Sequence, residues 1–520
     1  MRQVQTGRMH RSPRKAVFSV RNALLCGLCA TIGIAQISPV GAETLNEAIA
    51  EAYRNNPSLK AEQADARASD EVVAQARAQY GPSISARASY GYTENRFVPS
   101  TIAPRVNGFG TEYSVMLSQP LFTSGRLTAN LAQATAGQGI SRETMRSAGL
   151  TLLSDVVTVY VGVLRDQQLV EIAQQNVDIL SGQFEQTSAR YKARFATVTD
   201  LNQTENRLAF GRAQLEIARG NLLGSRNSYR NVIGHYPGQL APVTPLQALP
   251  ATLDDALLLA DRQNPNLEIA RLSEQASRAQ LAAARANRGP NVSLDASAGR
   301  TPFSIETDST SQINLSAQVS VTMPLYTSGL LDARVREVLQ RNDADNQRVE
   351  QASRNVREQI ASLWDQISAI RRAIPIYRAA VVAAESAVVG VRTQQAAGQA
   401  TSLDVLDTTR DLLTSRTAEI QAEAQLYALH SSLLAALGEL DVADFAPVEL
   451  LYDPDVYSVS GIVGLPTGPL IEPFDRVLYN SRPAHGAVQI ENGSEPGHDM
   501  ATEPTTSLAA PPAGSPPPPR

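Results

Sequence analysis

An internal duplication constrains this 520-residue chain more than any other feature of its sequence. Four short motifs recur in the same order in both halves. The pairs are Asn56-Pro57 and Asn264-Pro265, Gly81-Pro82 and Gly289-Pro290, Pro120 to Gly125 and Pro324 to Gly329, and Thr197 with Asp200 and Thr401 with Asp404. The offset is 208 residues for the first two pairs and 204 for the others, so a four-residue length difference lies between them. The sequence therefore predicts two copies of one structural unit, residues 43–250 and 251–447.

Each unit contains two stretches in which apolar and polar side chains alternate. In residues 83–92 one face carries Ile84, three alanine or tyrosine side chains and Tyr92. Each run is about 10 residues long, the length that a tilted strand of a membrane barrel requires. Half-exposed strands of a soluble sheet would alternate in the same way. We expect four strands per chain, with loops at 96–110 and 300–311.

Two segments of about 70 residues, 126–195 and 329–397, contain no strong helix breaker except Pro375. At about 1.5 Å per residue, each helix would reach roughly 105 Å. Apolar residues recur in them every seven positions. The series are Val156, Val163, Val170, Val177, Phe184 and Tyr191, and Ile360, Ile367, Ile374, Val381 and Val388. This repeat predicts coiled-coil packing, interrupted by Asp166 in the first unit and kinked at Pro375 in the second unless neighbours compensate.

Shorter helices are expected on either side of the long ones. Opening helices are predicted at 57–80 and 265–288, where a proline suits the first helical position. Return helices are predicted at 199–234 and 401–437. A return helix and an opening helix together nearly match the length of one long helix, which predicts an elongated rod.

The first 42 residues read as a signal peptide. Basic residues up to Arg21 precede an apolar run at 23–37, and small residues at Val40 and Ala42 predict cleavage after Ala42. A transmembrane anchor is the alternative, but about 15 apolar residues are fewer than the roughly 20 that a bilayer needs. No later segment is expected to cross a membrane as a helix, so membrane insertion would use a β-barrel.

Composition excludes several classes of function. Beyond residue 42 there are 40 basic and 51 acidic residues without a basic cluster, which argues against nucleic-acid binding. The only cysteines, Cys26 and Cys29, lie in the predicted signal peptide, so disulfide scaffolds and cysteine-based sites are excluded. No catalytic or metal-binding motif is present, and we expect no enzyme, cofactor or metal. Residues 448–520 form a Pro-rich tail, and its distal part is expected to be disordered.

Together these motifs resemble the TolC family of outer-membrane export ducts over residues 44 to about 454. The closest segment runs from Gly398 to Asp407, and Leu-Tyr-Asp-Pro454 follows the second unit. The resemblance implies a mixed α/β membrane protein that forms a homotrimer. Four strands per chain would build a twelve-stranded outer-membrane β-barrel, continued by a periplasmic α-helical tunnel.

The resemblance also implies a function. The chain would be the passive outer-membrane channel of a tripartite efflux pump or a type I secretion system. Its partners would be a periplasmic adaptor, an inner-membrane pump of ABC or RND type and outer-membrane lipid, and it would arrive by Sec export. The alternative is a periplasmic coiled-coil tethering protein without a pore, against which the paired alternating segments argue.

A candidate periplasmic gate follows from the same resemblance. In the family an acidic pair lines the constriction at the inner helix turns; Asp404 and Asp407 match that pair, and Asp200 matches an acid of the first unit. Three chains would place six carboxylates from the pair around one opening, which should repel anions, attract cations and raise some pKa values. Helix capping is the alternative role for Asp200 and Asp404, whereas Asp407 lies one turn deeper. Ala400 and Gln395 replace an arginine and a tyrosine that lock the gate in some relatives, which argues against that lock here.

Overall fold

The computed structural model describes residues 42–95, 106–243, 245–305 and 308–440. The signal peptide up to residue 41, the Leu-Tyr-Asp-Pro454 motif and the Pro-rich tail 448–520 lie outside the described residues. In chain order the elements are α1 (Leu45–Asn55), α2 (Pro57–Ala78), β1 (Ser83–Asn95), β2 (Val106–Phe122), α3 (Arg126–Lys192), α4 (Val198–Ile233), α5 (Leu253–Gln263), α6 (Pro265–Ala286), β3 (Asn291–Ile305), β4 (Asp308–Thr322), α7 (Leu330–Ala396) and α8 (Ser402–Leu437).

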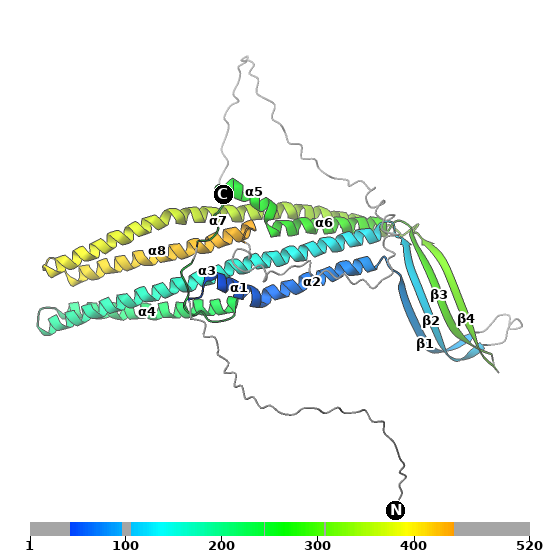
Figure 1. Ribbon diagram of the computed structural model, residues 1–520, viewed down its shortest axis with the longest axis horizontal. Coiled ribbons are helices and arrows are strands. Elements are labelled where there is room, and N and C mark those ends of the chain that lie inside the picture. The colour runs from blue at the N-terminus through cyan, green and yellow to red at the C-terminus, as the bar shows by residue number, and fades with distance from the viewer. Residues whose placement is uncertain (1–41, 96–105, 244, 306–307, 441–520) are drawn as a thin grey trace, which may run out of the picture.

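The helices form a rod and the strands form a sheet at one end of it (Figure 1). The same order of elements occurs twice along the chain: two short helices, two strands, a long helix and a return helix. Helices α3 and α7 have 67 residues each. The return helices α4 and α8 have 36 residues each and fold back along them, so that α3 with α4 and α7 with α8 form two hairpins. The rod therefore has the sheet at one end and two hairpin tips at the other.

The Asn-Pro motifs end one short helix and begin the next. The side chain of Asn56 accepts hydrogen bonds from the backbone N–H groups of Ser58 and Leu59, while its amide donates to the carbonyl of Val232 at 3.1 Å. Asn264 repeats this arrangement and donates to the carbonyl of Ala436 at 2.7 Å. Each motif thus ties a helix start to the end of a return helix. The preceding helices α1 and α5 were not expected as separate elements.

The predicted coiled-coil seam is fully formed in the second unit, where all five members of the seven-residue series are buried. In the first unit the series is buried near the middle of the rod, at Val156 and Val163, and becomes exposed at the tip, at Tyr191. Asp166 lies buried in this seam, and its carboxylate accepts a hydrogen bond from Nε of Arg165 at 2.8 Å. Pro375 lies inside α7, which continues without interruption.

The four strands form one antiparallel sheet in the order β1-β2-β3-β4. They have 13, 17, 15 and 15 residues, longer than the expected 10 or so. The loop predicted at 300–311 is wrong, because β3 continues to Ile305 and β4 already begins at Asp308. Backbone groups make the ladder, so serine- and threonine-rich segments can pair as strands without an apolar pattern.

Strand register separates apolar from polar side chains. Residues directly opposite each other share a face of the sheet, as Val115 does with Ala86 and Ala298. The apolar face carries Ile84, Tyr90, Val115, Leu117, Ala296, Leu315, Val319 and Val321, and the polar face carries Ser85, Arg87, Ser114, Ser118, Asp295, Ser297, Ser316 and Gln318. Leu315 is 78% exposed in the single chain. So large an exposed apolar face requires a further partner, either lipid or protein.

The main core lies where the linker between the two units crosses the rod. Tyr160 of α3 and Tyr229 of α4 are fully buried there, and the Tyr229 hydroxyl donates to Oε1 of Glu43 at 2.6 Å. Burial raises the pKa of Tyr160 to about 12, because it disfavours the phenolate. A second cluster packs α5, α7 and α8 together, and Trp364 contacts it as a packing residue.

The expectation that no later segment could cross a membrane as a helix is too strong. Helices α3 and α7 each contain an 18-residue stretch that is long and apolar enough. The core helix of a soluble protein passes the same test, so the observation is weak evidence for a helical span. Both stretches belong to 67-residue helices whose apolar residues repeat every seven positions and pack against other helices.

Candidate functional site

The two hairpin tips contain all three predicted gate residues. The turn from α3 to α4 places Arg194 at a positive φ of 63°, and the turn from α7 to α8 places Gly398 at 77° in the corresponding position. Each return helix then begins at a threonine in extended conformation, Thr197 or Thr401. The repeat therefore extends to the backbone geometry of the tips.

Asp200 and Asp404 form capping boxes with these threonines. Oγ1 of Thr401 accepts a hydrogen bond from the backbone N–H of Asp404 at 3.2 Å, and Oδ2 of Asp404 accepts one from the backbone N–H of Thr401 at 2.8 Å. Thr197 and Asp200 make the same pair of contacts at 3.1 and 2.9 Å. The capping role predicted for both acids is confirmed.

These contacts lower the pKa of both carboxyl groups. For Asp200 and Asp404 the threonine backbone N–H is the main cause and the threonine hydroxyl the second, because both donate to the ionised form. Within one chain this direction is opposite to the rise expected from six clustered carboxylates. Asp200 and Asp404 are therefore held in their charged forms by their own helix starts.

Acidification should loosen the tips only at low pH. The folded pKa values of Asp200 and Asp404 lie below the unperturbed 3.8. The capping stabilisation is thus complete above about pH 4 and is lost as pH falls through the lowered folded values. We expect the hydrogen-exchange protection of the first turns of α4 and α8 to be constant from pH 7 to 5 and to fall below pH 3.8. The double variant T197A/T401A should show weak protection at every pH; lost protection between pH 7 and 5 in the unaltered protein would contradict this assignment.

Asp407 has a different partner. Its Oδ1 accepts a hydrogen bond from Nη1 of Arg207 at 2.9 Å, in an ion pair between α4 and α8. The pair thus joins the α3/α4 hairpin to the α7/α8 hairpin near the tips. Arg207 could not be predicted from the sequence as a partner of Asp407, because it lies 200 residues away and belongs to no motif around the tip turns.

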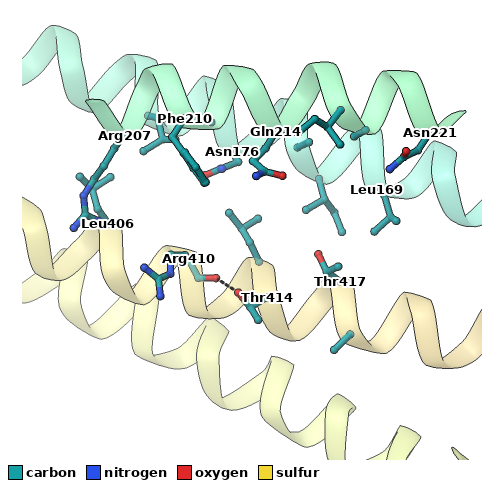
Figure 2. A pocket seen from close by; sticks show the side chains of 18 of the residues that line it. Leu169, Asn176, Arg207, Phe210, Gln214, Asn221, Leu406, Arg410, Thr414 and Thr417 are labelled. Carbon is teal, nitrogen blue, oxygen red and sulfur yellow. Dashed lines mark hydrogen bonds between the residues drawn. The ribbon is translucent and has the colours of Figure 1, made fainter. Parts of the chain in front are cut away.

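Arg207 of this ion pair lines two cavities. The larger one, about 730 Å³, is lined by residues of α3, α4 and α8, and Figure 2 shows Phe210 and Gln214 beside it, with Arg207 and Leu406 together at one end. The smaller one, about 410 Å³, lies between the tips and also includes Arg207 and Leu406 in its lining. Leu406 is buried against Leu180 and Leu208. Near the tips the contacts between the two hairpins therefore include the apolar contact of Leu406 and the ion pair of Arg207 with Asp407, and Arg207 and Leu406 both line the two hollows.

Gln395 and Ala400 line the smaller cavity together with Asp200. Nε2 of Gln395 donates to Oγ of Ser402 at 3.1 Å, so its amide is bound within its own hairpin. In this chain Arg207 supplies an ionic contact between the hairpins near the tips, through Asp407. Within the described ranges, no group of three or more His, Cys, Asp or Glu residues is arranged to hold a metal ion.

The chain is similar to known proteins in both copies of the duplicated unit. Residues 48–235 and 257–439 match the sequence model of the outer membrane efflux protein family. The outer membrane efflux protein BepC of Brucella suis is 28% identical over 414 residues, which cover 78% of this chain and 89% of BepC. The outer membrane protein TolC of Escherichia coli is 25% identical over 417 residues, 78% of this chain and 84% of TolC. The resemblance drawn from the motifs is confirmed.

Another relative carries the word secretion in its name. Solved structures also share the fold of this chain. The alkaline protease secretion protein AprF of Pseudomonas aeruginosa is 24% identical over 342 residues, 64% of this chain and 70% of AprF. The crystal structure of the outer membrane protein VceC of Vibrio cholerae matches with a TM-score of 0.64 at 21% identity, covering 76% of this chain and 96% of VceC.

Proposed function

This chain belongs to the outer membrane efflux protein family, and on that premise we propose that three copies form one passive duct through the outer membrane and the periplasm. The duct serves an efflux pump or a type I secretion system. Efflux is supported by the name of BepC and secretion by that of AprF. The chain would reach the outer membrane by Sec export, after loss of residues 1–42.

The two-faced sheet is the observation that carries this proposal. Four strands cannot close a barrel, and the unpaired edges of β1 and β4 would leave backbone groups unsatisfied in lipid. Three copies supply twelve strands and can remove every edge. The apolar face would then meet lipid and the serine-rich face would line the lumen, as in membrane barrels. A periplasmic tether without a pore would not need a sheet with one apolar and one polar face.

The helices would continue the barrel as a periplasmic tunnel. A 67-residue helix is about 100 Å long at 1.5 Å per residue. At its far end three copies would bring together the carboxylates of Asp404 and Asp407, with Asp200 nearby. Because Arg207 pairs with Asp407, the ring carries less net negative charge than six free carboxylates would. Asp404 then supplies most of the cation preference at the gate.

The driving force must come from partners, since the sequence contains no energy-coupling motif. We assign that role to an inner-membrane pump of ABC or RND type, reached through a periplasmic adaptor. The exposed tips, which lie farthest from the sheet, are the part of the chain that would extend toward such partners (Figure 1).

Electron microscopy of detergent-extracted protein tests the assembly. We expect a particle with threefold symmetry and a rod of about 100 Å, from the helix rise, beneath a barrel-sized cap. Planar bilayers containing the same preparation should show discrete, cation-preferring single-channel conductances. A water-soluble rod without a cap, or bilayers without channels, would replace the duct by the tethering function.

A further inference from the structure

Within the four described strands, the apolar face of the sheet carries a single basic residue, Arg300 of β3. Arg300 comes two residues after Ala298 and therefore lies on the same face. It is directly opposite Tyr113 of β2 and Ile313 of β4. Its side chain is exposed, and its guanidinium has no hydrogen-bond or ion-pair partner among the described residues. An unpaired charge on an apolar surface calls for a partner from outside the chain.

Arg300 lies toward the end of the sheet that is farther from the rod (Figure 1). Val292, where the apolar face of β3 begins, is at the other end and precedes it by eight residues. At about 3.4 Å per residue and a tilt of about 45°, eight residues rise about 19 Å. The apolar band of an outer-membrane barrel is about 25 Å tall. In the proposed barrel Arg300 therefore lies near the outer edge of this band.

Aromatic side chains lie at the level of Arg300 and just beyond it. Tyr113 is opposite Arg300, and its side chain is 55% exposed. Farther from the rod on the same face, the ring of Phe109 lies 5.9 Å from that of Tyr90 and 5.2 Å from that of Tyr92. Tyrosines are typical of the boundary between hydrocarbon and head groups, because they combine an apolar ring with a polar hydroxyl. The aromatic side chains therefore place the same boundary near Arg300.

The described strands offer Arg300 no negative charge on its own face. The only carboxylate at an apolar-face position is Glu94, which lies six residues beyond Ala88, the residue of β1 in the row of Arg300. Six residues span about 20 Å along a strand. Glu112 and Asp295 are on the polar face, where they accept hydrogen bonds from serine hydroxyls. The positive charge of Arg300 is thus complementary to an anion that approaches from the lipid side.

We propose that Arg300 binds the phosphate group of a phosphorylated lipid in the outer leaflet, with the acyl chains of that lipid along the apolar face. This inference rests on the proposed insertion of the sheet into the outer membrane. A guanidinium binds phosphate through two parallel hydrogen bonds, which a lysine cannot reproduce. The Tyr113 hydroxyl supplies a further donor, and the exposed side chains of Val115 and Leu315 supply the surface for the acyl chains. Each site is complete within one chain, because β3 is an inner strand of the sheet.

Native mass spectrometry of the detergent-extracted, delipidated protein tests the site with two probes, bisphosphorylated lipid A and the same lipid without its phosphates. We expect the phosphorylated lipid to bind at least fivefold more tightly. Arg300→Ala should remove this preference, and Arg300→Lys should reduce it, because an ammonium lacks the paired donors. Arg87→Ala is the matched control. Arg87 is one row away in the sheet, opposite Ser114 on the polar face, so its loss should leave lipid binding unchanged. Inorganic phosphate at the same concentration should not displace the lipid, because it has no acyl chains.

The outcomes separate this site from the duct itself. Equal binding of the two lipids, or equal binding of the phosphorylated lipid by Arg300→Ala and Arg87→Ala, overturns the site. Displacement by inorganic phosphate also overturns it, since the site would then recognise any phosphate. If the same preparation still forms channels in planar bilayers, the proposed function stands in all three cases. An unaltered protein that fails to insert overturns both. Arg300→Ala should remain in the outer membrane, because it removes a charge from the apolar face, so its loss of lipid would not reflect failed insertion.

Discussion

Replacing Val319 by arginine should prevent the protein from inserting into the outer membrane, while the same replacement of the adjacent Gln318 should be tolerated. Val319 lies on the apolar face of β4, and Gln318 lies on the polar face. An arginine facing lipid costs up to about 2–4 kcal/mol, depending on its depth in the bilayer, and a trimer carries three of them. An arginine facing the lumen remains in water. The matched pair changes one strand by one position and moves the charge from one face to the other.

The measurement is the share of protein that stays in the outer-membrane fraction after a urea wash. We expect a loss of tenfold or more for V319R and less than twofold for Q318R, since 1.4 kcal/mol corresponds to a tenfold change in an equilibrium. Circular dichroism of V319R in detergent should still show the helices, because the rod packs independently of the sheet face. Equal retention of both variants would mean that the apolar face does not contact lipid.

The ion pair between Arg207 and Asp407 should control both the charge preference and the opening of the gate. Removing Arg207 leaves three uncompensated carboxylates in the trimer, so R207A should increase cation preference. Removing the carboxylate leaves three uncompensated guanidinium groups, so D407N should decrease it. Two unit charges 4 Å apart in water interact with about 1 kcal/mol. We therefore expect R207A and D407N each to change the permeability ratio severalfold, in opposite directions.

Conductance should respond differently from selectivity. Both single variants break the ion pair that joins the hairpins near the tips, so both should increase single-channel conductance. The double variant R207A/D407N should keep the larger conductance and return the permeability ratio toward that of the unaltered channel. Reversal potentials in a salt gradient measure the ratio. If the two single variants shift the reversal potential in the same direction, the pair lies outside the ion path and acts only as a contact between helices.

Much of this fold can be predicted from the sequence, because its signals are local. A seven-residue repeat fixes which face of α3 or α7 is buried, and Thr-x-x-Asp fixes where α4 and α8 begin. Alternation likewise predicts the strands, although not their ends, since paired backbones continue through Arg300 without help from side chains. Asp200 and Asp404 were correctly predicted as caps for the same reason, as each contacts a residue three positions away.

Only the tertiary structure determines the contacts between the α3/α4 hairpin and the α7/α8 hairpin, because these contacts depend on how the two hairpins are placed relative to each other. Each hairpin is stabilised by its own seam, so neither seam specifies the other hairpin's position. Helix α6 packs on both α3 and α7 and brings the hairpins side by side. Only then can Arg207 contact Asp407, 200 residues away in the chain. Only then, too, is Ser124 of the first unit buried against Pro290 of the second, while its counterpart Ser328 stays exposed. The sequence by itself determined the duplicated unit, because periodicity and capping act over a few residues. The pairing of the units was decided in three dimensions, because it depends on contacts between helices that are far apart in the chain.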